Sequence, residues 1–170
     1  MASLNDFGVC LEVGKKGETA VKNTLTARGW KIEDVSKQTE YQQKDIDLIV
    51  WQTENDSRTI EIKYDSRIAD TGNMFVEYCS NSRTGRAGWL SYCKAEYIFY
   101  VDARNNLSYC FLLEDLKNYI EVNKNKLRQG TTRDGYKEVY GYLVSINDFR
   151  EFLVLYKDSY FQELDLIEVA

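Results

Sequence analysis

The sequence predicts a single α/β domain, because segments with the periodicity of helices alternate with segments that have the periodicity of strands. Residues 11–28 carry apolar side chains at helical spacing, and two pairs of apolar runs with period-two alternation predict two β-hairpins. The chain has 170 residues and 44% hydrophobic content, which is enough for a sizeable core. With no repeat and no internal boundary, residues 1–170 are expected to form one domain with residues 1–10 as an N-terminal extension.

The first predicted helix carries a carboxylate among its apolar side chains. Its stripe, at spacings of 3, 4, 3 and 4, consists of Leu11, Gly14, Glu18, Val21 and Leu25. Gly29 follows as the expected left-handed residue after the last turn. A lone buried carboxylate is costly, so Glu18 should have a partner, either in a metal site, which we favour, or in a structural salt bridge.

The first predicted hairpin places three charged side chains on one face. Its strands are the apolar runs 46–51 and 59–64, separated by a polar turn. The alternation leaves Asp47 on one strand, and Glu61 with Lys63 on the other, opposite the apolar face. With the turn midway between the runs, Asp47 should lie opposite Lys63, and Glu61 one diagonal step away.

Two carboxylates and an ammonium on one sheet face are the groups that phosphodiester hydrolysis needs. Mg²⁺ binds oxygen ligands, commonly one or two carboxylates with water and substrate phosphate oxygens. It polarises the phosphate and lowers the pKa of a bound water. A lysine on the same face can orient or help to deprotonate that water, or balance developing charge. A cross-strand salt bridge on a solvated surface explains the same pattern and stays open as the alternative.

These residues resemble the PD-(D/E)-x-K nuclease superfamily, with Glu18 on a first helix, Asp47 at a strand start, and Glu61-Ile62-Lys63 after a hairpin turn. The similarity covers about residues 11–102. Phage-type members of the superfamily are similar in four further segments: Asp65-Ser66-Arg67, Thr71-Gly72-Asn73-Met74-Phe75-Val76-Glu77, Gly88-Trp89 and Lys94-Ala95-Glu96-Tyr97. Ile46 stands where the signature proline would be, a position that commonly varies in the superfamily.

The resemblance implies a restriction-endonuclease-like fold, which is a central mixed β-sheet flanked by helices. It implies that Asp47 and Glu61 bind Mg²⁺ or Mn²⁺ together with the backbone carbonyl of Ile62. It also implies that Lys63 assists the attacking water, and that Glu18 is an additional catalytic carboxylate near the metal.

Two segments offer positive charge for contacts with the DNA backbone. In residues 65–96, a stretch of small polar residues, the candidates are Arg67, Arg83, Arg86 and Lys94. Residues 123–138 are expected to form a basic loop, in which the candidates are Lys124, Lys126 and Arg128. Solvated surface loops are the plain alternative for both segments. Glu77, on a strand predicted over residues 74–79, is a further candidate acid for the site.

The remaining elements are expected to build the core. The predicted strands are 30–35 and 140–146, with a second hairpin at 97–101 and 107–112 and a helix at 114–122. Asn147 should cap a helix that runs through Tyr156. Residues 160–169 predict either a last strand or a dimer surface, so a homodimer stays open.

Composition excludes several classes of enzyme. The chain has no histidine, which removes Ser-His-Asp hydrolases, Cys-His hydrolases and histidine-dependent metal nucleases. Its four cysteines lack C-x-x-C spacing, which favours reduced, mostly buried thiols. A net charge of −5 argues against indiscriminate nucleic-acid binding, although a local basic groove is compatible with it. No apolar run approaches the roughly 18 residues of a membrane span, and no signal peptide is evident, so we expect a cytoplasmic protein.

The function that these observations favour is a metal-dependent DNA endonuclease with Mg²⁺ or Mn²⁺ as cofactor and DNA as partner. Structured or branched DNA such as a junction is a candidate substrate, since a junction resolvase would act as a symmetric dimer. The alternatives are a catalytically silent DNA-binding domain and a protein-interaction domain, each on the same fold.

Overall fold

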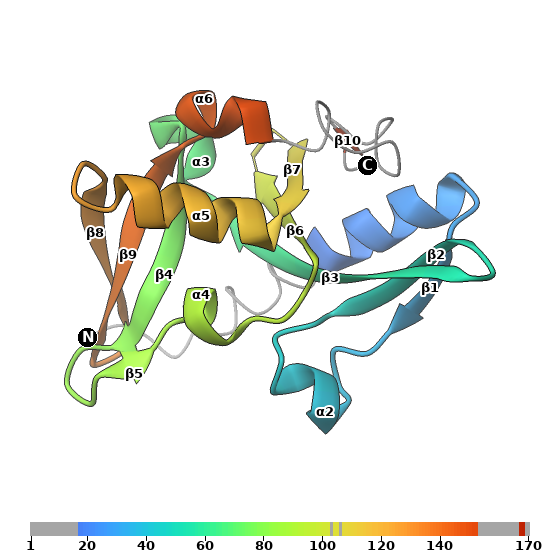
Figure 1. Cartoon of the computed structure of the whole chain (residues 1–170), viewed down its shortest axis with the longest axis horizontal. Helices are drawn as coiled ribbons and strands as arrows, with labels where there is room; N and C mark the ends of the chain where they lie inside the picture. Colours follow the sequence, from blue (N-terminus) through green and yellow to red (C-terminus); the bar gives the residue numbers. More distant parts are fainter. Residues whose placement is uncertain (1–16, 103, 106, 153–166, 169–170) are drawn as a thin grey trace.

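A mixed six-stranded sheet forms the centre of the molecule in a computed structural model, which describes residues 17–102, 104–105, 107–152 and 167–168 (Figure 1). Its strands, in spatial order, are β1 (Lys31–Asp34), β2 (Leu48–Thr53), β3 (Asp56–Asp65), β6 (Tyr97–Asp102), β7 (Leu107–Leu112) and β10 (Ile167–Glu168). Strands β3 and β6 are parallel, and the other neighbouring pairs are antiparallel. The predicted fold class, α/β with a central mixed sheet flanked by helices, is confirmed.

A second, antiparallel sheet stands beside the first and was not predicted as a unit. Its strands, in spatial order, are β5 (Arg86–Ala87), β4 (Asn73–Asn81), β9 (Lys137–Ser145) and β8 (Arg128–Asp134). The expected basic loop over 123–138 is wrong in its second half, because β8 and a two-residue turn occupy it. This strand lies at the sheet edge with mostly exposed side chains, so backbone pairing forms it without an apolar alternation in the sequence.

Helices cover the central sheet on both faces. The helix described over residues 17–27 packs on one face and is followed by Gly29 at φ 84°, as predicted. On the other side lie α5 (Leu113–Asn123) and three single turns, α3 (Ile68–Thr71), α4 (Trp89–Tyr92) and α6 (Ile146–Phe149), the last continued by η1 (Arg150–Phe152). A further turn, α2 (Thr39–Gln42), lies between β1 and β2. No helix in the described part of the chain is long and apolar enough to cross a membrane.

The cap of α6 differs from the prediction. The hydroxyl of Ser145 accepts a hydrogen bond from the backbone N–H of Asp148 at 3.3 Å, so Ser145, not Asn147, is the N-cap. The β-strand before it ends at the same serine, and the helix therefore begins without an intervening loop. The predicted continuation to Tyr156 lies outside the described residues.

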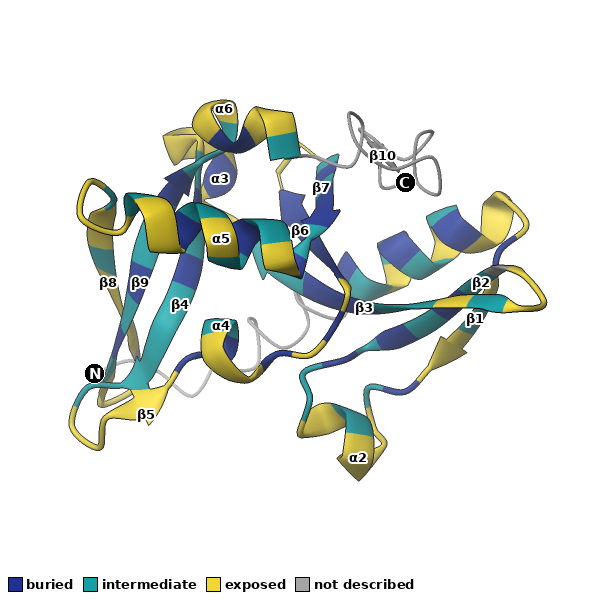
Figure 2. Ribbon diagram, viewed as in Figure 1, coloured by how far each residue is buried: buried dark blue, intermediate teal, exposed yellow. Residues whose placement is uncertain are grey.

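Strand β6 is buried along its whole length because it serves two cores (Figure 2). Tyr97, Phe99 and Val101 pack with the helix over 17–27, whereas Ile98 and Tyr100 pack with α4, α5 and the second sheet. Successive side chains of a strand point to opposite faces, so a central strand with both faces covered is apolar at every position. The strand ends at Asp102, whose carboxylate is buried but accepts backbone hydrogen bonds from the turn that follows.

The β2–β3 hairpin keeps its predicted faces but has a different register. Leu48 pairs with Ile60, and continuing this register places Asp47 across from Glu61, not from Lys63 as predicted. A β-bulge between Trp51 and Thr53 shifts the pairing by one residue, and the turn, which follows the Thr53–Asp56 pair, shifts it by one more. The change amounts to two residues, and an even change leaves each side chain on the face that alternation gave it.

Candidate active site

Asp47 and Glu61 form the buried part of the candidate site. Asp47 immediately precedes β2, and its Oδ2 accepts a hydrogen bond from the backbone N–H of Ile62 at 2.9 Å. Glu61 lies in the middle of β3 and is only 5% exposed, and its carboxyl group is in hydrogen-bond contact with that of Asp47. The hairpin thus brings two carboxyl groups together where water is largely excluded.

The two carboxyl groups are harder to ionise than ordinary ones. Burial raises the pKa of Glu61 well above its usual value; Lys63 opposes this shift, and the neighbouring Asp47 adds to it. Burial also raises the pKa of Asp47, against the lowering effects of the Ile62 N–H and of Glu61. Two carboxyl groups in contact are stable when they share a proton or when a cation neutralises them.

Lys63 supplies a cation at this position. Its Nζ lies 2.5 Å from Glu61 Oε1, 2.8 Å from Asp45 Oδ2, and 5.0 Å from the centre of the Trp89 ring. Burial lowers the pKa of Lys63, but the charges of Glu61 and Asp45 and their hydrogen bonds outweigh it, so the pKa is raised. Lys63 is therefore an ammonium ion at neutral pH and acts as a hydrogen-bond donor rather than as a base.

Asp45 belongs to the site and was not a predicted site residue. It stands two residues before Asp47, where its carboxylate pairs with Lys63, and its side chain is 20% exposed. Its φ of 54° is the only positive value of a non-glycine residue in the described part of the chain. Asp45 lies in the turn before β2, where strand alternation does not apply, so the D-x-D spacing of Asp45 and Asp47 was the only signal in the sequence.

Glu77 approaches the same charges from the second sheet. Burial raises the pKa of Glu77, while Lys63 lowers it and Asp45 raises it, so the three groups are electrostatic neighbours. The Trp89 backbone N–H donates a hydrogen bond to the Glu77 carboxylate. Gly88 permits this approach, because a Cβ there would lie 2.4 Å from the Glu77 carbonyl oxygen. Glu77, which the sequence suggested as a further acid of the site, therefore lies close to Lys63.

Glu18 is not grouped with these residues. It lies on the helix that packs against the sheet face opposite Glu61 and Lys63. Its carboxylate is 3.9 Å from Nζ of Lys22, which also pairs with Asp34 on β1. Of the two kinds of partner expected for Glu18, the structure supplies a salt bridge.

The structure separates the seven predicted DNA-binding residues into two groups. Three of them lie near the acidic cluster: Arg67 and Arg128 line the cleft described below, and the charge of Arg86 lowers the pKa of Glu77. The other four are exposed on the surface outside the cleft lining: Arg83, Lys94, Lys124 and Lys126. Lys124 forms an ion pair with Glu121 at 2.6 Å.

A cleft of about 780 Å³ runs between the two sheets beside the acidic cluster. Lys63 and Glu77 line it, and Glu61, which contacts Lys63, is not part of the lining. Strand β8, at the edge of the second sheet, contributes Arg128 and a polar run to the far wall. Lys63 and Glu77 are therefore open to a ligand through this cleft, and Lys63 connects it to Glu61.

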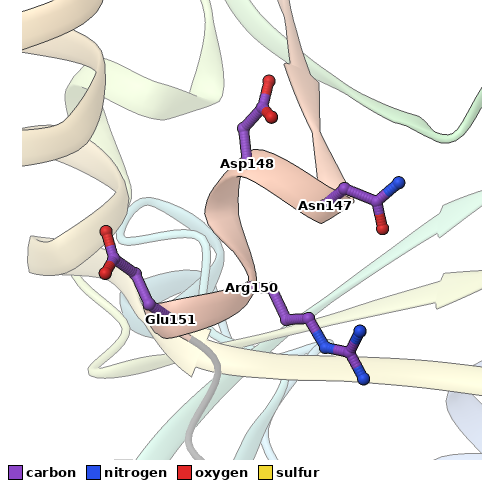
Figure 3. Close-up of a pocket in the computed structure, with 4 residues that line it drawn as sticks. All are labelled: Asn147, Asp148, Arg150 and Glu151. Atoms are coloured by element: carbon purple, nitrogen blue, oxygen red, sulfur yellow. The ribbon is translucent and has the colours of Figure 1, made fainter.

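A second pocket, of about 450 Å³, lies on α6 and η1 (Figure 3). Its lining residues are Asn147, Asp148, Arg150 and Glu151. Figure 3 shows these four side chains pointing away from one another, so no common point receives several functional groups. Convergent polar groups distinguish a binding site from a surface hollow, and this pocket lacks them.

The residues present fit a divalent cation by their chemistry. Asp47 and Glu61 offer adjacent carboxylates, and Ile62, whose N–H binds Asp47, has a backbone carbonyl that could complete an all-oxygen set of the kind that Mg²⁺ prefers. Among the described residues, no three His, Cys, Asp or Glu side chains are gathered in a metal-binding geometry. A site with two carboxylates does not require a third, because Mg²⁺ commonly keeps several waters.

Comparison with protein-family models, with curated proteins and with solved structures finds no match to this chain. Its function therefore has to be argued from the charged cluster and the cleft.

Proposed function

We propose that the protein is a metal-dependent endonuclease that hydrolyses DNA phosphodiester bonds, as a member of the PD-(D/E)-x-K superfamily. The observation that carries the proposal is the contact between the Asp47 and Glu61 carboxyl groups, with Lys63 beside them and itself lining a cleft. A structural ion pair with Lys63 needs only one carboxyl group. A site for a divalent cation needs two carboxyl groups close together, in spite of the repulsion between them when both are ionised.

Asp47, Glu61 and the Ile62 carbonyl would hold Mg²⁺ or Mn²⁺. The bound ion would polarise the scissile phosphate and lower the pKa of a coordinated water. The carboxyl groups bind such an ion in their ionised form, so their raised pKa values link binding to loss of protons. Glu77 would contribute further negative charge from the opposite wall.

Lys63 would bind the attacking water and the phosphate with its ammonium hydrogens. A positively charged donor stabilises the negative charge that develops on phosphate oxygens in the transition state. Asp45 and Glu61 orient this donor, because both accept hydrogen bonds from Nζ. The face of Trp89 on its third side limits its movement.

The two-sheet arrangement agrees with the restriction-endonuclease-like fold in its mixed central sheet, whose parallel pair β3–β6 carries Glu61 and Lys63. Branched DNA such as a junction is a candidate substrate, and a homodimer would suit it. The free thiols of Cys79, Cys93 and Cys110 favour a reducing compartment, for which we propose the cytoplasm.

A catalytically silent DNA-binding or protein-interaction domain on the same fold is the second candidate. The observation in its favour is that Lys63 already pairs with two carboxylates, as in a structural salt bridge. In that case the cluster would stabilise the β2–β3 hairpin and bind no metal. Binding of Mn²⁺ separates the two functions.

The test is cleavage of plasmid, linear duplex, single-stranded and four-way-junction DNA with Mg²⁺ or Mn²⁺. Asp47→Asn, Glu61→Gln and Lys63→Met proteins are compared with Lys44→Met, a lysine whose side chain pairs with Glu40 on the surface. We expect the first three proteins to lose cleavage and Lys44→Met to cleave like the wild type. Activity that survives in Asp47→Asn and Lys63→Met, or wild-type protein that neither cleaves nor binds Mn²⁺, would refute the proposal.

A further inference from the structure

The cleft beside Lys63 has the dimensions of a small-ligand site and not of a groove for a double helix. Its volume of about 780 Å³ lies within the range of roughly 300–1,000 Å³ that encloses a single small molecule. One or two nucleotides fill such a space. Proteins that act inside a confined pocket take up nucleotides that are unpaired or flipped out of the stack.

Phe75 gives this cleft a flat aromatic wall. It lies on β4, and its ring covers Gly141 on β9 and Gly130 on β8, two glycines that face each other in the sheet. A Cβ at Gly141 would lie 2.7 Å from Cζ of the ring, and one at Gly130 would lie 3.3 Å from Cε2. The ring therefore lies against bare backbone, and Phe75 also lines the cleft.

The other aromatic residues of the lining are already engaged, and the Tyr64 ring packs against Gly17 of the helix over 17–27. Trp89 is 6% exposed and holds Lys63 over its ring, and the buried Tyr100 donates its hydroxyl hydrogen to the Phe75 carbonyl at 2.7 Å. Both fix their neighbours in place. Phe75 is half-buried, lines the cleft and holds no charged group over its ring, so it offers a stacking surface to a planar ligand such as a base.

Two arginines supply positive charge in the same cleft. Arg67 follows β3 and Arg128 begins β8, so they reach the cleft from different sheets. Neither guanidinium group has an ion-pair partner within the part of the chain that the structure describes. Hydroxyl groups accompany them, from Ser66, Thr71, Thr131 and Thr132.

An aromatic wall between free cations is the combination by which proteins bind unpaired nucleic-acid strands. We propose that this cleft binds an unpaired segment of the DNA strand, with a base stacked on Phe75 and the adjacent phosphates held by Arg67 and Arg128. The inference rests on the proposed function, because it places the strand against Lys63 and Glu77. It specifies the substrate as single-stranded DNA or the unpaired part of a branched molecule.

The experiment measures binding without cleavage. Fluorescence anisotropy in EDTA compares a labelled oligothymidylate with a blunt duplex of matched length. We expect the single strand to bind more tightly than the duplex. Phe75→Leu should weaken oligothymidylate binding by about 5- to 150-fold, the range measured for removal of one stacking residue. Arg128→Met should weaken it and reduce the slope of log K against log salt by about 0.7, the value for one phosphate contact on a single strand.

Matched controls separate a local effect from a general one. Tyr136→Leu removes an aromatic ring that is 91% exposed at the β8–β9 turn, and Lys31→Met removes an exposed charge from β1, an edge strand of the six-stranded sheet. Both should bind like the wild type. Thermal melting shows whether Phe75→Leu is folded. If that variant does not fold, Arg128→Met tests the inference instead, because it changes an exposed residue.

Each outcome bears on one of the two proposals. Equal or tighter binding of the duplex, or unchanged binding in Arg128→Met and in folded Phe75→Leu, would overturn the inference. Tight, Phe75-dependent binding of the single strand by a protein that cleaves nothing and binds no Mn²⁺ would support the inference and overturn the proposed catalysis.

Discussion

Asp45 has a left-handed backbone conformation, and its Oδ2 lies 2.8 Å from the ammonium nitrogen of Lys63. Two contacts fix this turn: the Cys93 thiol donates to the Asp45 carbonyl at 3.4 Å, and the Lys94 N–H donates to the Lys44 carbonyl at 2.8 Å. Left-handed conformations cost a non-glycine residue roughly 1–2 kcal/mol, and aspartate tolerates them best among charged residues. Conformational strain of this kind gathers at functional sites.

Substitutions at Asp45 should separate its charge from its backbone. Asp45→Asn keeps the shape and removes the charge, so Lys63 loses one of its two anchors. We expect cleavage to fall by about 10²-fold, the cost of displacing a catalytic group by about 1 Å. Asp45→Gly should lose as much activity but be more stable than Asp45→Ala by about 1 kcal/mol, because glycine adopts positive φ freely. Urea denaturation measures the difference, and equal stabilities of the two variants would contradict it.

Binding of Mn²⁺ should release protons and strengthen with pH. In the folded protein the pKa of Glu61 is raised from an ordinary 4.5, and that of Asp47 from 3.8, so these groups keep protons that a free carboxyl group has lost. The ion binds the ionised form, and its affinity therefore rises as pH increases from about 5 through the raised pKa values. Calorimetry in two buffers of different ionisation enthalpy counts the released protons, and Glu61→Gln should release fewer.

The same shifts set the sign of the pH dependence of stability. A carboxyl group with a raised pKa binds more protons in the folded state than in the unfolded state, so the free energy of unfolding falls as pH rises above its ordinary pKa. Without metal, the wild type should therefore lose stability as pH rises from about 5 through the raised pKa values, and Glu61→Gln should lose less. The raised pKa of Lys63 acts in the alkaline range above its ordinary 10.5, outside this window. A wild-type profile that rises over the window would contradict the assignment.

The sequence predicted which side chains share a face, because alternation depends on neighbours along one strand. Asp47, Glu61 and Lys63 were found in this way. Their exact pairing was not, because neither the bulge in β2 nor the exact position of the turn is visible in the apolar pattern. Glu77 reaches the site through contact between two sheets, and β8 is held by backbone bonds at an edge. Neither arrangement leaves a periodic signal in the sequence. The second sheet and the cleft could therefore be identified only from the structure.

The Cys93 thiol should be unreactive in the folded protein. Burial raises the pKa of Cys93 to about 12, so the reactive thiolate is scarce at neutral pH. Its side chain is fully buried, whereas Cys79 is partly exposed. Brief treatment with iodoacetamide followed by peptide mass spectrometry should find Cys79 alkylated and Cys93 unmodified until the protein is denatured. Rapid alkylation of native Cys93 would show that the turn at Asp45 opens.

Gly88→Ala should damage the site through close packing alone. The φ of Gly88 is −82°, which any residue adopts, but a Cβ would lie 2.4 Å from the oxygen and 2.6 Å from the carbon of the Glu77 carbonyl. Backbone atoms cannot rotate away, so α4 and β4 must separate and carry Trp89 and Glu77 away from Lys63. We expect a loss of about 1–3 kcal/mol of stability together with a loss of cleavage.

Gly29→Ala is the matched control. Gly29 ends the helix over 17–27 at φ 84°, and a Cβ there meets nothing within 4 Å. That substitution should cost about 1 kcal/mol through backbone strain and leave cleavage unchanged, because its surroundings do not move. The two variants can be compared at a temperature where both are folded. Under that condition, full cleavage by Gly88→Ala would show that the spacing between α4 and β4 does not position the catalytic groups.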